Sequence, residues 1–285
     1  MAEPRRAIGV DVGGSGIKAA LVDVDAGQFA SERIRVPTPS PSTPEAVVAS
    51  IGRLVKRLVK ASAIDASVPL GLGLPGVVLD GVLKTAANID ASWVDFPITE
   101  RLRKMLKRPV TIANDADVAG IAEMRFGVGQ GRGGVVVMLT LGTGVGSAVF
   151  IDGTLVPNAE FGQMEIRGRP AERRSASVAR TRRGLSWKAW ASDLDEHLHR
   201  IDELVWPDLI IVGGGVSKNA DKFIPRLTVR PPVVQAKLRN DAGIIGAAVV
   251  AIERMAADAT AAEAGTAPST AAVDGAAGAA AAAGG

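Results

Sequence analysis

Backbone N–H groups that could bind phosphate occur in a glycine-rich stretch near the start of the chain. The apolar residues 8–10 lead into a turn with three glycines among four residues, and a second apolar run follows at residues 19–22. A turn without side chains can close its N–H groups around a phosphate oxygen, and a neighbouring hydroxyl or ammonium group adds further donors. The residues predicted to hold phosphate here are Gly13, Gly14, Ser15, Gly16 and Lys18.

This first turn is predicted to be a β-hairpin and not a Walker A loop. A Walker A loop has the pattern Gly-x4-Gly-Lys-Ser/Thr and opens a helix. Here a second extended run follows the glycines and ends at Asp23 and Gly27. A plain two-strand turn is the alternative that these residues leave open, because glycine-rich hairpins are common.

The same pattern occurs a second time, which favours the phosphate interpretation. The apolar residues 135–141 lead into Gly142, Thr143 and Gly144, and another apolar run follows at residues 147–151. A fold built from two related halves would bring the two turns together across a cleft, where both could hold one phosphate chain.

A third glycine loop, Gly213, Gly214 and Gly215, follows the apolar strand predicted at residues 208–212. We expect it to lead into a helix, whose N-terminus would favour an anion. A purely structural strand-to-helix turn is the alternative.

A carboxylate that could act as a base follows another predicted strand. Residues 110–113 form an apolar run that ends on Asn114 and Asp115, before a helix predicted from residue 118 to 126. In open α/β sheets, ligands bind outside the carboxyl ends of the strands, so this pair is well placed for chemistry. Capping of the helix by Asn or Asp is the alternative.

The composition limits the class of protein. With 285 residues, 47% of them hydrophobic and 22% charged, the composition predicts a soluble globular protein that is large enough for two lobes with separate cores. No cysteine is present, which excludes disulfides and cysteine-bound zinc and agrees with the reducing cytoplasm that we expect. The first residues lack an apolar signal segment and no long apolar run appears, so neither export nor a membrane span is predicted.

Basic residues gather in two clusters that could face a polyanion. One lies within residues 101–108 and the other, with seven arginines, within residues 167–183. Nucleic acid is not the expected partner, because tyrosine is absent, aromatic residues make up only 4% of the chain, and no reader motif is present. A solvated basic face is the alternative for either cluster.

The remaining segments are predicted to be mainly structural. A helix capped by Thr43 should place the apolar residues between 47 and 59 on one stripe. A second helix begins at Ser186 and carries both histidines, His197 and His199, which we expect at the surface. Residues 242–255 predict a final buried helix. From residue 256 to 285 small residues dominate, and we expect a disordered tail.

Seven motifs, in order and with matching spacing, resemble the ROK family of sugar kinases. Within this family the chain is similar to the actinobacterial polyphosphate glucokinases and polyphosphate/ATP-glucomannokinases, and the resemblance covers about residues 6–255. The motifs are Asp11-x-Gly-Gly-Ser-Gly-x-Lys18, Leu74-Pro-Gly76, Thr85-Ala-Ala-Asn88, Asn114-Asp-Ala-Asp117, Leu141-Gly-Thr-Gly144, Glu160-Phe-Gly-Gln163 and Val212-Gly-Gly-Gly215.

The resemblance implies an actin-like, ribonuclease-H-like α/β fold with a cleft between two lobes. It implies an N-terminal lobe at 1–112, joined by the helix 242–255, and a C-terminal lobe at 113–241. It also implies a homodimer that phosphorylates the 6-hydroxyl of glucose or mannose with polyphosphate, ATP or both, together with Mg²⁺ and without zinc.

Each matched position takes a role from the resemblance. Asp115 matches the general base, and Asp11 would orient Mg²⁺ or its water. The sugar ligands would be Pro75, Gly76, Asn88, Asn114, Glu160, Gln163 and Glu172. The groups that hold the donor phosphates or nucleotide would be Asp11, Gly13, Gly14, Ser15, Gly16, Lys18, Thr140, Gly142, Thr143, Gly144, Gly213, Gly214 and Gly215.

The chain departs from the family pattern at three positions. The family usually has a histidine where Gln163 stands, and an acidic residue and a histidine where Arg167 and Arg169 stand. Glutamine still donates and accepts hydrogen bonds but carries no charge. We hypothesise that the two arginines extend the track of a long polyphosphate. A strictly ATP-dependent kinase, with Gly213 near the adenosine, and a weakly active or inactive sugar-binding paralogue are the alternatives.

Overall fold

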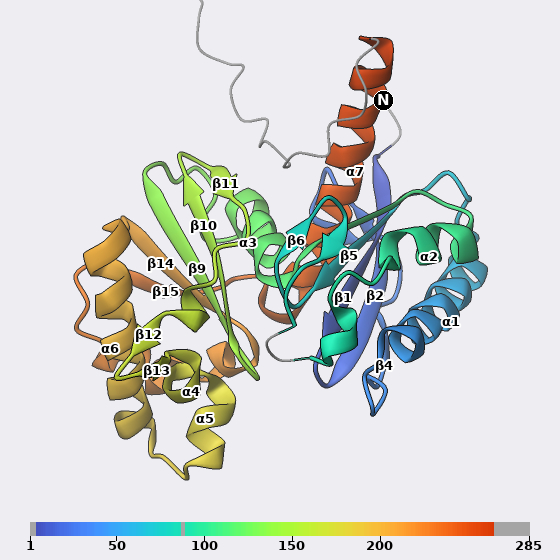
Figure 1. The fold of residues 1–285 in the computed structure, drawn as a ribbon. Helices are drawn as coiled ribbons and strands as arrows, with labels where there is room; N and C mark the ends of the chain where they lie inside the picture. Colours follow the sequence, from blue (N-terminus) through green and yellow to red (C-terminus); the bar gives the residue numbers. More distant parts are fainter. Residues whose placement is uncertain (1–3, 87–88, 265–285) are drawn as a thin grey trace, which may run out of the picture.

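The computed structural model describes residues 4–86 and 89–264, which form two β-sheets with helices between and outside them (Figure 1). One sheet has six strands and the other has five. Helices α3 (Asp115–Phe126) and α7 (Ala242–Glu263) lie between the sheets, while α1 (Pro44–Ser62) and α2 (Ile98–Leu106) cover the outer face of the first. Helix α6 (Trp187–Val205) covers the outer face of the second.

The first sheet has the strand order β3-β2-β1-β5-β8, with β4 paired to β2. Strands β1 and β2 form an antiparallel hairpin, whereas β1, β5 and β8 run parallel, so their carboxyl ends meet at one edge. The strands are β1 (Arg6–Gly13), β2 (Gly16–Asp23), β3 (Gln28–Phe29), β4 (Ile34–Val36), β5 (Leu70–Leu74) and β8 (Val110–Asn114).

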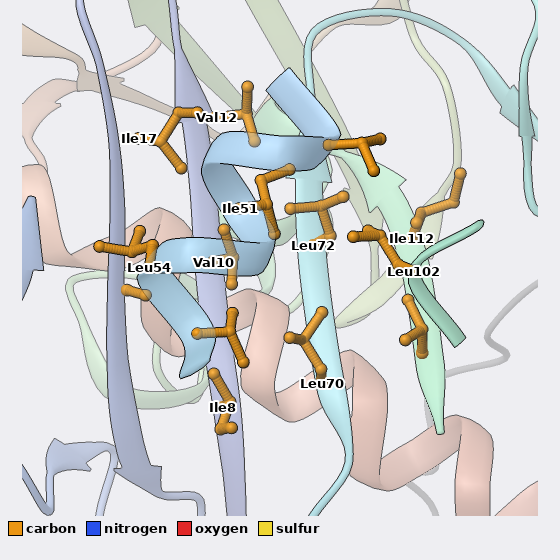
Figure 2. Packing of buried hydrophobic residues seen from close by; sticks show 14 of the residues in the cluster. Ile8, Val10, Val12, Ile17, Ile51, Leu54, Leu70, Leu72, Leu102 and Ile112 are labelled. Atoms are coloured by element: carbon orange, nitrogen blue, oxygen red, sulfur yellow. The ribbon is translucent and has the colours of Figure 1, made fainter. Parts of the chain in front are cut away.

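Alternating side chains of β1 pack against α1, as the sequence pattern predicts. Figure 2 shows Ile51 and Leu54 of the helix over Ile8 and Val10 of the strand. The helix begins where predicted, because the Thr43 hydroxyl accepts a hydrogen bond from the Ala46 N–H and proline occupies the first turn. This packing holds β1, and therefore the turn at its end, on a rigid support.

The second sheet has the order β11-β10-β9-β14-β15, with β9 and β10 forming its hairpin. Strands β9 and β14 run parallel, as do β14 and β15. The strands are β9 (Val135–Leu141), β10 (Val145–Ile151), β11 (Thr154–Val156), β14 (Leu209–Gly213) and β15 (Val233–Gln235).

Short elements join the two sheets and complete the second half. They are the hairpins β6 (Val78–Leu79) with β7 (Val82–Leu83) and β12 (Glu165–Ile166) with β13 (Arg169–Pro170), and the helices α4 (Glu172–Ser175) and α5 (Ser177–Arg182). The 3₁₀ helices are η1 (Ala91–Trp93), η2 (Phe161–Gln163), η3 (Gly215–Lys222), η4 (Ile224–Arg226) and η5 (Arg239–Asp241).

Helix α7 packs directly on the backbone of the first sheet and of α3. A side chain at Gly9 or Gly71 would collide with the backbone of Ile244 or Ala247, so only glycine permits this approach. The apolar residues of α3 and α7 form one buried core with residues of both sheets, such as Val22 and Phe150. The two halves are therefore joined by a shared core and not by a linker alone.

Three predictions about the elements need correction. Helix α7 continues to Glu263, so the prediction of a disordered tail from residue 256 is wrong for residues 256–263. The high helix propensity of alanine extends the helix beyond its buried part. The loop at Gly213 leads into a 3₁₀ helix with non-helical backbone at Asn219, and not into a regular α-helix. The lobe boundary predicted after residue 112 falls inside β8, which stays paired with β5 through Asn114.

Within the described residues, none of the helices combines the length and the apolar character that a membrane span requires.

Candidate active site

The two predicted glycine turns face one another. Each closes an antiparallel hairpin, the first after the pair Gly13 and Gly16, and the second between β9 and β10. A methyl group built on Gly14 would lie 3.6 Å from the Thr143 hydroxyl oxygen, so the turns are in near contact. The prediction that a two-part fold brings these turns together is confirmed.

Two side chains that sequence reasoning missed support the first turn. The Arg35 guanidinium, on β4, donates to the Ser15 carbonyl at 2.7 Å, and the Thr38 hydroxyl donates to the Gly13 carbonyl at 2.6 Å. These two contacts fix the carbonyls of the turn, and Arg35 adds positive charge where an anion is predicted to bind. Only the pairing of β4 with β2, which is not visible in the sequence, reveals these contacts.

Asp115 lies where the parallel strands of the first sheet end. Asp11 of β1 is level with Gly73 of β5, and Asn114 of β8 is level with the end of β5. Asp115 follows as the first residue of α3. A methyl group on Gly146 of β10 would lie 3.8 Å from the Asp115 Oδ1, so the carboxylate faces the second sheet next to its glycine turn.

The surroundings of Asp115 favour a base that works near neutral pH. Burial raises the pKa of this carboxyl to about 7, and the negative charges of Asp11 and Glu160 contribute in the same direction. Asp11 itself forms an ion pair with Lys18, at 2.8 Å between Oδ2 and Nζ. Lys18 therefore neutralises this carboxylate, and its ammonium group keeps two further N–H donors, so its contact with phosphate stays a prediction.

Asn114 both caps α3 and joins the sugar-side residues. Its Oδ1 accepts hydrogen bonds from the N–H groups of Ala116 and Asp117, while its Nδ2 donates to the Gly76 carbonyl at 3.0 Å and to Glu160 at 3.3 Å. Asn114 therefore caps the helix, as the alternative predicted, and its Nδ2 contacts two other predicted sugar ligands. Burial and the charge of Glu172 raise the pKa of Glu160.

The other predicted sugar ligands lie on neighbouring segments. Pro75 and Gly76 follow β5 directly, and buried Glu172 accepts a hydrogen bond from the Val145 N–H at 3.1 Å, which places it beside the second glycine turn. Gln163 is exposed at the end of η2. Asn88 lies outside the described residues.

Asn158 was missed as a candidate, although it connects both halves at the site. Its side chain makes hydrogen bonds to the N–H and the carbonyl of Val78, at 2.8 and 3.0 Å, and its own N–H donates to Asp117 at 2.9 Å. Asp117 is only 3% exposed, and burial raises its pKa to about 7. Asn158 lies two residues before Glu160, so it fixes the loop that carries this carboxylate.

The prediction that both histidines lie at the surface is wrong for His197. This side chain is fully buried, with Nε2 at 3.0 Å from the Phe161 carbonyl and Nδ1 at 2.9 Å from the Ser175 hydroxyl. His199 is exposed as predicted. His197 therefore ties the segment that contains Glu160 to the helix that begins with Glu172.

The third glycine loop lies against the second. A side chain on Gly214, which has a φ of 79°, would collide with the backbone of Leu141. Thr140 is level with Gly146 on one side and with Gly213 on the other. The third glycine segment thus lies next to the second, on the other side of β9 from Gly146.

The carboxylates of the described residues do not form a complete metal-binding site. No group of three or more His, Cys, Asp or Glu side chains among them could hold a metal ion. Asp11 remains a hard oxygen donor two residues before the first glycine turn. Magnesium is commonly bound by one or two carboxylates plus substrate phosphates, which such a position fits.

Two α/β sheets with facing glycine hairpins, a carboxylate at a strand end and a shared pair of helices define the actin-like sugar kinase fold. The profile of the ROK family matches residues 7–165. The chain belongs to the ROK family.

Relatives and solved structures agree with this family. The chain is 46% identical, over 249 residues, to the polyphosphate glucokinase of Mycobacterium tuberculosis, with 87% of this chain and 92% of the relative covered. It is 47% identical to the inorganic polyphosphate/ATP-glucomannokinase of Arthrobacter sp. strain KM, with a TM-score of 0.84 and 87% and 98% of the two chains covered. A ROK family glucokinase from Streptomyces griseus, in complex with glucose and AMPPNP, gives 26% identity and a TM-score of 0.75, with 87% and 99% covered.

Proposed function

We propose that this protein is a glucokinase that transfers the terminal phosphoryl group of inorganic polyphosphate, ATP or both to the 6-hydroxyl of glucose. The observation that carries the proposal is Asp115, which lies beside two glycine turns that face each other. The names of the relatives, polyphosphate glucokinase and polyphosphate/ATP-glucomannokinase, support the same activity. The second name extends the proposal to mannose.

In the proposed reaction, Asp115 takes the proton of the sugar hydroxyl as its oxygen attacks the terminal phosphorus. The new O–P bond forms while the bridging O–P bond of the donor breaks, and the bond electrons leave with the shortened donor. A carboxyl with a pKa of about 7 holds a proton more firmly than an ordinary aspartate does, so it is a stronger base when ionised. Positioning of the two reactants supplies much of the remaining rate enhancement.

The sugar would be held by hydrogen bonds from both halves of the protein. Asn114 and Glu160 are already hydrogen bonded to each other, and Glu172 lies next to the second turn. Carboxylates and amides can each bind neighbouring hydroxyl groups. Gln163, with Asn88, would complete this set.

The donor would lie along the glycine turns. The N–H groups of residues 13–16 and 142–144 would hold its phosphates, with Thr140 beside them and the loop 213–215 near a nucleotide. Magnesium would be held by Asp11 together with the donor phosphates, and it would neutralise charge on the transferred group. We also propose a homodimer in the cytoplasm, as the family resemblance implies.

A coupled assay tests the proposal with glucose and mannose, each with ATP and with polyphosphate plus Mg²⁺. Asp115→Asn should abolish turnover and leave glucose affinity, measured by calorimetry, largely intact, because the amide keeps the shape but accepts no proton. Substantial turnover by this variant would refute the role of Asp115. Glucose binding without turnover by the unaltered protein would favour the inactive paralogue that the exposed Gln163 suggests.

A further inference from the structure

A pocket lined by arginines lies outside the site described above. Its volume is about 560 Å³, and the β12–β13 hairpin, α4 and the end of α5 form its walls. Figure 1 shows these elements together beside the second sheet. The six arginines of the pocket are Arg167, Arg169, Arg173, Arg174, Arg182 and Arg183.

The hairpin that carries two of these arginines is a tight turn. Arg167 and Gly168 have φ angles of 54° and 74°, as in the two-residue type I′ turn. Buried Ile166 anchors the hairpin, while Arg167 and Arg169 on either side of the glycine are exposed. Local geometry thus presents both guanidinium groups on one surface of the protein.

Positive charge exceeds negative charge in this pocket. Two carboxylates of α6 face it: Glu196 pairs with Arg167 at 2.7 Å, and Asp193 pairs with Arg174 and with Arg183. Over the part of the chain that the structure describes, no carboxylate pairs with the other three arginines. Six guanidinium groups against two carboxylates leave an excess of four positive charges. The unpaired arginines are Arg169, Arg173 and Arg182.

Several basic residues outside the pocket have structural partners. Arg108, only 7% exposed, donates to the Val68 carbonyl at 2.9 Å, and Arg103 donates to the Val110 carbonyl. Arg180 stacks on Trp187, with 4.0 Å between the guanidinium carbon and the ring centre. The first basic cluster is thus partly used by the fold, whereas the pocket retains free cations.

The pocket and the second glycine turn are built on one short segment. The Val178 N–H at the start of α5 donates to the Gly142 carbonyl at 3.1 Å, and Glu172 of α4 binds the Val145 N–H. Arg173 is the next residue after Glu172, and Arg182 ends α5. The segment that carries these arginines therefore contacts the second glycine turn directly.

We propose that this arginine pocket binds the non-reacting part of a long inorganic polyphosphate whose end is transferred at Asp115. The inference rests on the proposed function and adds a second attachment point for that donor. Guanidinium groups match the geometry of phosphate oxygens, and every internal phosphate unit carries negative charge. A second attachment raises the effective concentration of the donor end at the glycine turns.

The test compares donors of different length on a triple variant. Arg169→Gln, Arg173→Gln and Arg182→Gln together remove the unpaired charges, and all three side chains are exposed, so folding should be retained. A matched control removes three exposed charges on α1 by Lys56→Gln, Arg57→Gln and Lys60→Gln. The Michaelis constant is measured for long polyphosphate, for tripolyphosphate and for ATP, with thermal unfolding as a check of folding.

We expect the Michaelis constant for long polyphosphate to rise about tenfold in the pocket variant, from the loss of three charge pairs. The constants for tripolyphosphate and ATP, and all constants of the α1 control, should stay unchanged. An unchanged constant for long polyphosphate would overturn the pocket but leave the proposed function standing. Failure of the unaltered protein to use polyphosphate of any length would also overturn the pocket and would restrict the proposed function to ATP, whereas the absence of turnover with any donor would overturn both. Equal competition by single-stranded RNA of matched charge would refute polyphosphate as the specific ligand.

Discussion

Replacement of His197 tests how the sugar side of the site is supported. Burial lowers the pKa of this imidazole, so the ring is neutral at pH 7 and carries one hydrogen. The Phe161 carbonyl can only accept, and therefore Nε2 donates to it. With this hydrogen on Nε2, Nδ1 can only accept, so the Ser175 hydroxyl, which also lies 3.0 Å from the Ala171 carbonyl, donates to Nδ1.

The magnitude follows from these contacts. His197→Ala loses two hydrogen bonds, each contributing about 0.5–1.5 kcal/mol net, and leaves a void in a fully buried position. The Phe161 carbonyl keeps its bond from the Met164 N–H, so it is not left entirely unpaired. We therefore expect the free energy of unfolding to fall by about 2–4 kcal/mol. His197→Gln, which can keep one bond, should lose about half as much.

The same side chain predicts a pH dependence. Because the folded pKa of His197 is lowered, its contribution to stability is complete above about pH 6.5, the unfolded value, and is lost as the pH falls below it. One such group changes the free energy of unfolding by at most about 1.4 kcal/mol per pH unit. His197→Gln should remove this part of the slope.

Urea unfolding, followed by circular dichroism between about pH 5 and 8, measures the loss of stability and its pH dependence. The Michaelis constant for glucose is measured for the same variants. His199→Gln is the matched control, because this histidine is exposed on the same helix. A weaker support should raise the Michaelis constant for glucose only in the His197 variants. If His197→Ala were as stable as the His199 control, or if the pH slope were unchanged, the reasoning would be refuted.

Three further predictions concern other parts of the molecule. Gly71→Ala should destabilise the fold by about 1–3 kcal/mol in urea unfolding, because the new methyl group meets the Ala247 backbone; an unchanged midpoint would contradict the packing argument. The raised pKa of Asp117, about 7, makes stability fall as pH rises from about 4 to 7, and Asp117→Asn should flatten this slope in the same assay. Arg35→Gln should raise the Michaelis constant for either donor about threefold to tenfold in the coupled assay and leave the Michaelis constant for glucose unchanged. An equal rise in the constants for donor and for glucose would contradict the role of Arg35 at the Ser15 turn.

Features that depend on local chemistry were predictable from the sequence. The turns at Gly13 and Gly142 follow from glycine spacing between apolar runs, and the place of Asp115 follows from the rule that sites lie at strand ends. Thr43 caps its helix as predicted, and Ser186, with which a helix was predicted to begin, is the cap of α6, because short polar side chains bind the free N–H groups there.

Features that depend on contacts between distant segments were not predictable in the same way. Arg35 acts on the first turn only because β4 pairs with β2, and Asn158 acts through Val78 of the other half. His197 could have been found, since its spacing from Leu194 and Ile201 places it on the buried stripe of α6. The identity of its partners, however, requires the fold.

The position of α7 has a consequence for folding during synthesis. Strand β1, which carries Asp11, leaves the ribosome before the other strands, yet the helix that covers its inner face, at Gly9, is made after every other strand. Until residues 242–252 emerge, the nascent chain exposes the apolar surface that this helix buries. The reaction centre can therefore be assembled only late in translation, and its early parts are the natural target for chaperones in the meantime.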